Sequence, residues 1–182
     1  DGLGDPAVSV QACTQPVGYV TNSDDLCPLT VSGIANYNAG NCGCTPGYYP
    51  TYTTMSGEQV ITACTVCPAG SYCPDGLSGP TPCEAGKYSN ATGATSCTPC
   101  AAGSYNGSTG ATSCTPCEAG KYSNVMGATS CTPCAAGSYN GSTGATSCTP
   151  CEAGKYSNVM GATSCTPCAA GSYNGSTGAT SC

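Results

Sequence analysis

The sequence CEAGKYSNATGATSCTP, residues 83–99, decides the fold, because the close variant CAAGSYNGSTGATSCTP follows directly as residues 100–116. The two versions then alternate to residue 182 with a constant period of 17 residues. Residues 117–148 are identical to residues 151–182, and residues 83–114 differ from both only at Ala91 and Thr92. A short, fixed period of this kind indicates an array whose modules contact mainly their neighbours.

The repeat divides the chain into three parts. Residues 1–43 form an irregular, cysteine-containing head, residues 44–82 contain degenerate relatives of the module, and residues 83–182 hold six tandem modules. These modules span residues 83–99, 100–116, 117–133, 134–150, 151–167 and 168–182. Because no atypical capping module follows, we expect this stretch to belong to a longer array.

The composition favours covalent cross-links over a hydrophobic core. Cys accounts for 19 of the 182 residues, whereas Leu, Ile, Val and Phe together account for only 15. So few apolar side chains cannot offset the entropy lost on ordering a chain of this length. We therefore predict a small, disulfide-rich fold with little regular secondary structure, built as a linear array of 17-residue, disulfide-stapled β-hairpin modules behind an irregular N-terminal head.

The residue types that are missing exclude several function classes. Without His, no Ser-His or Cys-His nucleophile pair can form, so we predict no catalytic residues, no bound cofactor and no enzymatic activity. Only three cationic side chains are present, which argues against a nucleic-acid partner. No apolar run approaches the length that spans a bilayer. The net charge of −6 comes from the residues before the array. Within the array, the charges of the Glu and Lys residues cancel.

Each module follows the pattern Cys-x2-Gly-x-Tyr-x8-Cys. We expect the Gly, for example Gly86, to allow a positive φ or a close approach of another backbone segment, and the Tyr to lie over a neighbouring disulfide. In the alternate modules an Asn-Gly pair, such as Asn106-Gly107, predicts a two-residue hairpin turn. The Thr-Pro between modules limits bending of the array.

The cysteine spacing is also compatible with zinc, because the pattern Cys-x2-Cys-x13-Cys-x2-Cys resembles a pair of metal-binding knuckles. Three observations favour disulfides instead: the chain has N-glycosylation sequons, its Ser/Thr/Gly-rich surface is typical of extracellular proteins, and every array cysteine has a local partner. We therefore predict no metal site.

The module resembles the ephrin-receptor-type cysteine-rich repeat and the first loop of tumour-necrosis-factor-receptor modules. Tandem, nearly identical copies are similar to protist and algal coat proteins and to mastigoneme-like extracellular fibre proteins. The resemblance covers residues 44–182 and implies a secreted, disulfide-bonded, glycosylated rod. It implies the array pairs Cys83–Cys97, Cys100–Cys114, Cys117–Cys131, Cys134–Cys148, Cys151–Cys165 and Cys168–Cys182.

The pairing predicted for the remaining cysteines starts from these loops. In the degenerate modules we predict Cys44–Cys64 and Cys67–Cys73. We also pair Cys13 with Cys27, because their separation equals that of an array loop, which leaves Cys42 unpaired or bonded to another chain. The alternative is a Cys27–Cys42 bond with Cys13 left over.

The sequons predict N-linked glycans, with O-linked sugars on the Ser/Thr-rich stretches as a further expectation. The Asn-Gly sequons recur in every second module at a turn that we expect to be exposed. The predicted N-glycosylation sites are Asn90, Asn106, Asn140 and Asn174.

The sequence favours an extracellular or cell-surface structural protein that self-associates into a glycosylated filament or coat, because identical modules present identical surfaces at a fixed step. The alternative is an adhesion or receptor-like ectodomain or stalk, in which a protein or glycan partner binds the head. Tyr19, Tyr37, Tyr48, Tyr49 and Tyr52 are the side chains that could form such a patch.

Overall fold

The computed structural model describes residues 10–11, 29–31, 37–38, 43–55 and 58–182. These residues contain short β-strands and turns and no helix. The chain forms two compact units, one of residues 1–82 with 91–97 and one of residues 83–90 with 98–182. The predicted fold class, a disulfide-rich array of small hairpins, is confirmed.

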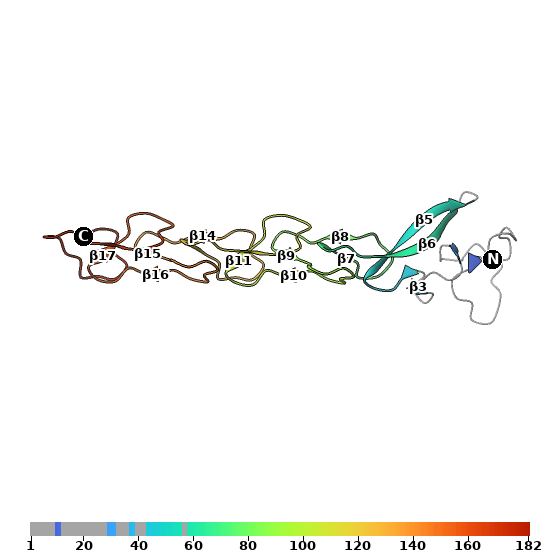
Figure 1. Cartoon of the computed structure of the whole chain (residues 1–182), viewed down its shortest axis with the longest axis horizontal. Helices are drawn as coiled ribbons and strands as arrows, with labels where there is room; N and C mark the ends of the chain where they lie inside the picture. Colours follow the sequence, from blue (N-terminus) through green and yellow to red (C-terminus); the bar gives the residue numbers. More distant parts are fainter. Residues whose placement is uncertain (1–9, 12–28, 32–36, 39–42, 56–57) are drawn as a thin grey trace. The chain divides into compact units, whose positions relative to one another are not determined.

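The first unit contains the strands β1 to β8 (Figure 1). Its largest sheet has the order β1-β2-β6-β5, with β2 parallel to β6 and the other pairs antiparallel. Two further antiparallel pairs, β3 with β4 and β7 with β8, complete the unit. The strands are β1 (Val10–Gln11), β2 (Leu29–Val31), β3 (Tyr37–Asn38), β4 (Gly43–Cys44), β5 (Tyr48–Met55), β6 (Glu58–Val66), β7 (Ser71–Tyr72) and β8 (Thr81–Pro82).

In the module opened by Cys44, the loop contains the long β5–β6 hairpin. Its first residues, Tyr48 and Tyr49, pair with Val66 and Thr65, and the pairing then continues outward past a bulge after Thr51. Val60 and Ile61 on β6 are the largest fully buried side chains described. The chain's few apolar residues are therefore concentrated in this non-repetitive unit, where a small core can form.

The second unit contains five two-stranded antiparallel hairpins in chain order (Figure 1). In each, the residue before the Tyr and the Tyr itself pair with the Thr-Pro that follows the closing Cys, as in Lys121↔Pro133 and Tyr122↔Thr132. The strands are β9 (Lys87–Tyr88), β10 (Thr98–Pro99), β11 (Ser104–Tyr105), β12 (Thr115–Pro116), β13 (Lys121–Tyr122), β14 (Thr132–Pro133), β15 (Ser138–Tyr139), β16 (Thr149–Pro150), β17 (Lys155–Tyr156) and β18 (Thr166–Pro167).

The prediction of a two-residue Asn-Gly turn is wrong. The strands of the second module, β11 and β12, are separated by residues 106–114, so Asn106-Gly107 does not close the hairpin. A type I′ turn needs positive φ at both central residues, and Gly107 does not have it, whereas Gly103 and Gly110 do. The Asn106 side chain instead donates to Lys87 O of the preceding module and to Ser108 O of its own.

The disulfides described for the chain join the pairs expected from the resemblance and from the degenerate modules. They are Cys44–Cys64, Cys67–Cys73, Cys100–Cys114, Cys117–Cys131, Cys134–Cys148, Cys151–Cys165 and Cys168–Cys182. Cys83 and Cys97 are also disulfide-bonded. Cys13, Cys27 and Cys42 lie outside the described residues, so their pairing stays a prediction.

Neighbouring modules are joined by four backbone hydrogen bonds, which recur at every step of the second unit. Counting the opening Cys as position 1, the groups involved lie at positions 1, 4, 7, 11 and 12. Between the third and fourth modules the donor–acceptor pairs are Gly120 N to Asn140 O (2.7 Å), Ser123 N to Ala145 O (3.1 Å), Gly144 N to Cys117 O (2.7 Å) and Cys134 N to Gly120 O (2.8 Å).

The degenerate modules of the first unit use part of the same scheme. Gly47 N donates to Cys73 O and Cys67 N donates to Gly47 O, so the modules opened by Cys44 and Cys67 are joined by two of the four array bonds. Cys73 N donates to Ala94 O and Gly93 N to Cys67 O, which continues the scheme. Because every bond is between backbone groups, the side chains could diverge here without changing how modules connect.

Each module also reaches the module after next. Gly120 of the third module has a φ of +81°, and a Cβ placed on it would collide with the backbone oxygen of Gly161 in the fifth module. Equivalent contacts join Gly86 to Gly127 and Gly103 to Gly144. The modules therefore contact more than their immediate neighbours, and glycine is required where two backbones meet.

Opening one disulfide should destabilise its own module. Replacing both Cys117 and Cys131 with Ala removes a loop constraint worth about 3 kcal/mol. Amide hydrogen exchange in residues 117–133 should then become roughly a hundredfold faster. The unaltered residues 151–167, identical in sequence but now different in mass, serve as the internal control. Unchanged exchange in residues 117–133 would contradict this role for the disulfide.

The backbone contact between alternate modules can be tested with two equivalent glycines. Gly120→Ala and Gly154→Ala both impose a positive φ on Ala, at a cost of about 1–2 kcal/mol. Only the first also meets a backbone oxygen, because nothing lies within 4 Å of a Cβ on Gly154. In calorimetry, Gly120→Ala should lower the unfolding temperature clearly more than Gly154→Ala. Equal effects would show that the contact carries no energy.

Candidate functional site

The candidate functional site is the solvent-exposed surface that is repeated from module to module. Position 7 of the module lies next to this surface. Position 7 is Ser or Asn in the array, and Ser123, Asn140 and Ser157 are buried there. In the degenerate module the same position is the fully buried Cys73, which is bonded to Cys67. Position 7 is thus buried in several modules of both kinds, whereas Asn106 and Asn174 at the same position are partly exposed.

Two of the Asn residues at position 7, Asn106 and Asn140, connect adjacent modules through their side chains. Asn140 donates from Nδ2 to Lys121 O in the preceding module (2.9 Å) and to Ser142 O in its own (2.9 Å), while its Oδ1 accepts from Ser142 N (3.0 Å). Asn106 makes the same three contacts, to Lys87 O and to both backbone groups of Ser108. Sequence analysis missed this role, although the regular alternation of Asn and Ser at one position was visible.

The sequons therefore occupy two different environments. The expectation that the Asn-Gly sequons lie at an exposed turn is wrong for Asn140, which is only 9% exposed. Asn106 and Asn174 are partly exposed, and the Asn174 side chain is hydrogen-bonded to Ser176 N and Ser181 O. Asn90, at position 8, is exposed.

The array also exposes apolar side chains at regular intervals. Val125 and Met126 are 55% and 67% exposed, and Val159 and Met160, at the same positions two modules later, are 56% and 67% exposed. An exposed Met is unusual on a surface that is otherwise rich in Ser, Thr and Gly. These positions are also where the first module differs, since it carries Ala91 and Thr92.

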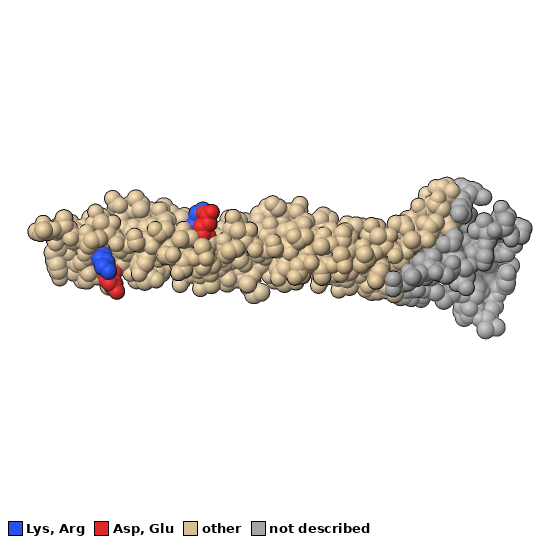
Figure 2. All heavy atoms as spheres, viewed as in Figure 1, with Lys and Arg blue, Asp and Glu red and all other residues tan. Residues whose placement is uncertain are grey.

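Charge on the second unit is confined to Lys–Glu pairs. They are Lys87–Glu84, Lys121–Glu118 and Lys155–Glu152, at nitrogen–oxygen distances of 3.0–3.2 Å. The hydrogen bond to the Glu118 carboxylate, together with its negative charge, raises the pKa of Lys121. Two pairs are visible on the face shown in Figure 2, on opposite edges, so equivalent modules are rotated relative to one another.

One carboxylate of the first unit is held by backbone groups. Leu77 N and Ser78 N both donate to Asp75 Oδ1, at 2.9 and 3.3 Å. These donors stabilise the charged form and lower the pKa of Asp75. The arrangement closes the turn of a degenerate module, where the charge stabilises local structure.

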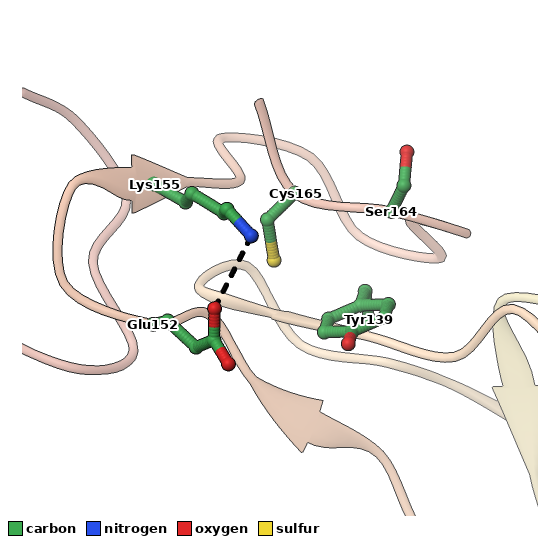
Figure 3. A pocket seen from close by; sticks show the side chains of 5 residues that line it. All are labelled: Tyr139, Glu152, Lys155, Ser164 and Cys165. Atoms are coloured by element: carbon green, nitrogen blue, oxygen red, sulfur yellow. Dashed lines mark hydrogen bonds and ion pairs between the residues drawn. The ribbon is translucent and has the colours of Figure 1, made fainter. Parts of the chain in front are cut away.

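A hollow of about 150 Å³ lies between the fourth and fifth modules (Figure 3). It is lined by Tyr139, Glu152, Lys155, Ser164 and Cys165. The Lys155 ammonium is bonded to the Glu152 carboxylate (3.2 Å), so the two charges that line the hollow largely offset each other. Small-molecule sites usually enclose at least about 300 Å³. Tyr139 and the closing Cys165 of the next module line the same hollow, and the role of the Tyr in covering a disulfide stays a prediction.

Within the described residues, no three His, Cys, Asp or Glu side chains are grouped as metal ligands would be. The same residues contain no helix long and apolar enough to cross a bilayer.

The tyrosine patch proposed for the head is only partly described. Tyr52 on β5 is 46% exposed, while Tyr48 and Tyr49 are partly buried. Tyr19 and the side chain of Tyr37 lie outside the described part of the structure.

Comparison with known families identifies the repeats. Residues 109–147 and residues 143–182 each match the family model described as tyrosine-protein kinase ephrin type A/B receptor-like. No curated protein matches the sequence. Repeats of this family are a non-catalytic domain type, and the hairpins and disulfides of the array agree with the match. Residues 109–182 are therefore similar to the ephrin-receptor-like family of cysteine-rich repeats.

Proposed function

We propose that this chain is an extracellular structural segment whose copies associate side by side into a filament or surface coat. The disulfides support the location, because such bonds persist in oxidising compartments. The observation that carries the proposal is the constant connection between modules, since the same four hydrogen bonds at every step keep identical surfaces at one spacing. A partner can contact the equivalent surface of every module only if its own binding groups are spaced as the modules are. A second copy of the chain has this spacing.

The exposed Val–Met pairs give this association an apolar contact. Val125–Met126 and Val159–Met160 recur at the same place in equivalent modules, and each pair leaves much of its surface exposed to water. Burying a Met side chain contributes about 1.5–3 kcal/mol, so several weak contacts along two arrays add to a stable association.

The charges of the array do not oppose close packing. Each Lys is paired with a Glu of its own module, so the second unit carries little net charge that would repel a neighbouring copy. The exposed ion pairs contribute little to stability themselves.

A receptor-like stalk or adhesion ectodomain is the second candidate, favoured by the family match and by Tyr52 exposed on the head. In that case the array would space the head from a surface and would remain dispersed. Association of purified protein distinguishes the two candidates.

We expect electron microscopy of the purified protein to show filaments or sheets whose assembly depends on the exposed Met residues. The double variant Met126→Gln/Met160→Gln keeps side-chain length but makes the contact polar. It should raise the concentration needed for assembly by about tenfold or more. Thr109→Gln/Thr143→Gln, at exposed polar positions, should assemble as the unaltered protein does. Dispersed monomers at all concentrations would favour the stalk.

Covalent linkage between copies is a separate expectation. Because 19 is odd, one cysteine of this stretch cannot pair within it, and Cys42 is the predicted one. If it bonds to another copy, electrophoresis without reductant should show a dimer that collapses to one band with reductant. The same dimer should vanish in Cys42→Ser. A monomer in both conditions would rule out the covalent link, leaving packing to hold the filament.

A further inference from the structure

We infer that the sequons of the array have divided roles: Asn90 carries an N-linked glycan, whereas Asn106 and Asn140 stay unmodified and serve as connectors between modules. The inference rests on the extracellular location in the proposed function, because the modification requires the secretory pathway. It does not depend on whether the protein forms filaments.

N-glycosylation needs the amide nitrogen of the Asn side chain. Nδ2 displaces a lipid diphosphate from the anomeric carbon of a lipid-linked oligosaccharide, forms the nitrogen–carbon bond and gives up one proton. A free Asn amide has two N–H donors, and the product keeps only one. An Asn whose two donors are both bonded in the folded protein therefore cannot carry a sugar without losing a bond.

Asn140 and Asn106 are in this situation. Both N–H groups of Asn140 are used, by Lys121 O of the preceding module and by Ser142 O, and the residue is 9% exposed. Nδ2 of Asn106 donates to Lys87 O (3.0 Å) and Ser108 O (2.9 Å). A glycan on either Nδ2 would have to displace one of these two acceptors and would not fit the closely packed boundary between modules without moving its backbone. Chains modified at these positions before folding could not complete the boundary between modules.

Asn90 has the opposite environment. It is exposed at position 8, one residue after the buried Ser89, and the sequon continues with Ala91 and Thr92. The equivalent residues Asn124 and Asn158 are also exposed. They are followed by Val-Met in place of Ala-Thr, so they lack the sequon, and the accessible position is glycosylatable only in the first module.

The number of glycans can be counted by intact mass before and after glycosidase, for protein secreted from a eukaryotic host. All variants carry Ser176→Ala, which removes the sequon of Asn174 and leaves the question to the other three. We expect one glycan in this background, none with Thr92→Met and two with Met126→Thr. The first change installs the residue found at Met126 and Met160, and the second creates a sequon at Asn124. Asn90 without a glycan, or no gain with Met126→Thr, would overturn the assignment.

The connector role has its own matched pair of variants. Ser142→Ala removes the sequon of Asn140 but keeps its amide and both backbone groups of residue 142, so glycan number and unfolding temperature should not change. Asn140→Ala removes the connector and should lower the unfolding temperature by several degrees, without loss of a glycan. Loss of one glycan with Ser142→Ala, or equal stability of the two variants, would contradict the inference.

The unfolding measurements also separate this inference from the proposed function. They can be made on protein refolded with its disulfides, even if the chain is not secreted. Failure of secretion would count against the extracellular role and against a glycan on Asn90. A stability difference between Asn140→Ala and Ser142→Ala would still support the connector, and its absence would still remove it.

Discussion

The backbone hydrogen bonds between modules are the interaction on which the rest of the structure depends. A single module has two strands of two residues, a length that is unstable alone in water. Its disulfide restricts the unfolded chain but leaves peptide groups without partners. Neighbouring modules supply those partners at positions 1, 4, 7, 11 and 12, so order extends along the array rather than inward to a core.

This way of building stability explains the composition. Peptide groups can pair at a module boundary whatever the side chains are, provided that two backbones can approach closely. Gly120 allows this close approach, because it has a positive φ and no side chain where it meets Gly161. Cys117, which opens the same module, is fully buried. The outward-facing positions are then free to be Ser, Thr or a Val–Met pair. An array of this type separates the residues that maintain the fold from those that face solvent.

The degenerate modules of residues 44–82 show how the scheme tolerates change. The module opened by Cys44 keeps the bonds at Gly47 and Cys67, although its loop has become the long β5–β6 hairpin. In the module opened by Cys67, position 7 is Cys73, where array modules have Ser or Asn. Cys73 O accepts from Gly47 N and Cys73 N donates to Ala94 O, as in the array. Both retain the backbone connection, and both vary between the shared bonding points. Exposed side chains that the array lacks, such as Tyr52, therefore lie in the extended loop of a module that keeps its backbone bonds.

Much of this architecture could be predicted from the repeat alone: the module length, the hairpins, the lack of a core and the positive φ at Gly120 follow from period, composition and spacing. The connector role of Asn140 could not, because an Asn-Gly pair also signals a local turn, and only folding brings Lys121 O to its side chain. The contact between Gly120 and Gly161 is hidden for the same reason. Which groups meet across one module boundary or two depends on the rotation from module to module, and a one-dimensional pattern does not contain that angle.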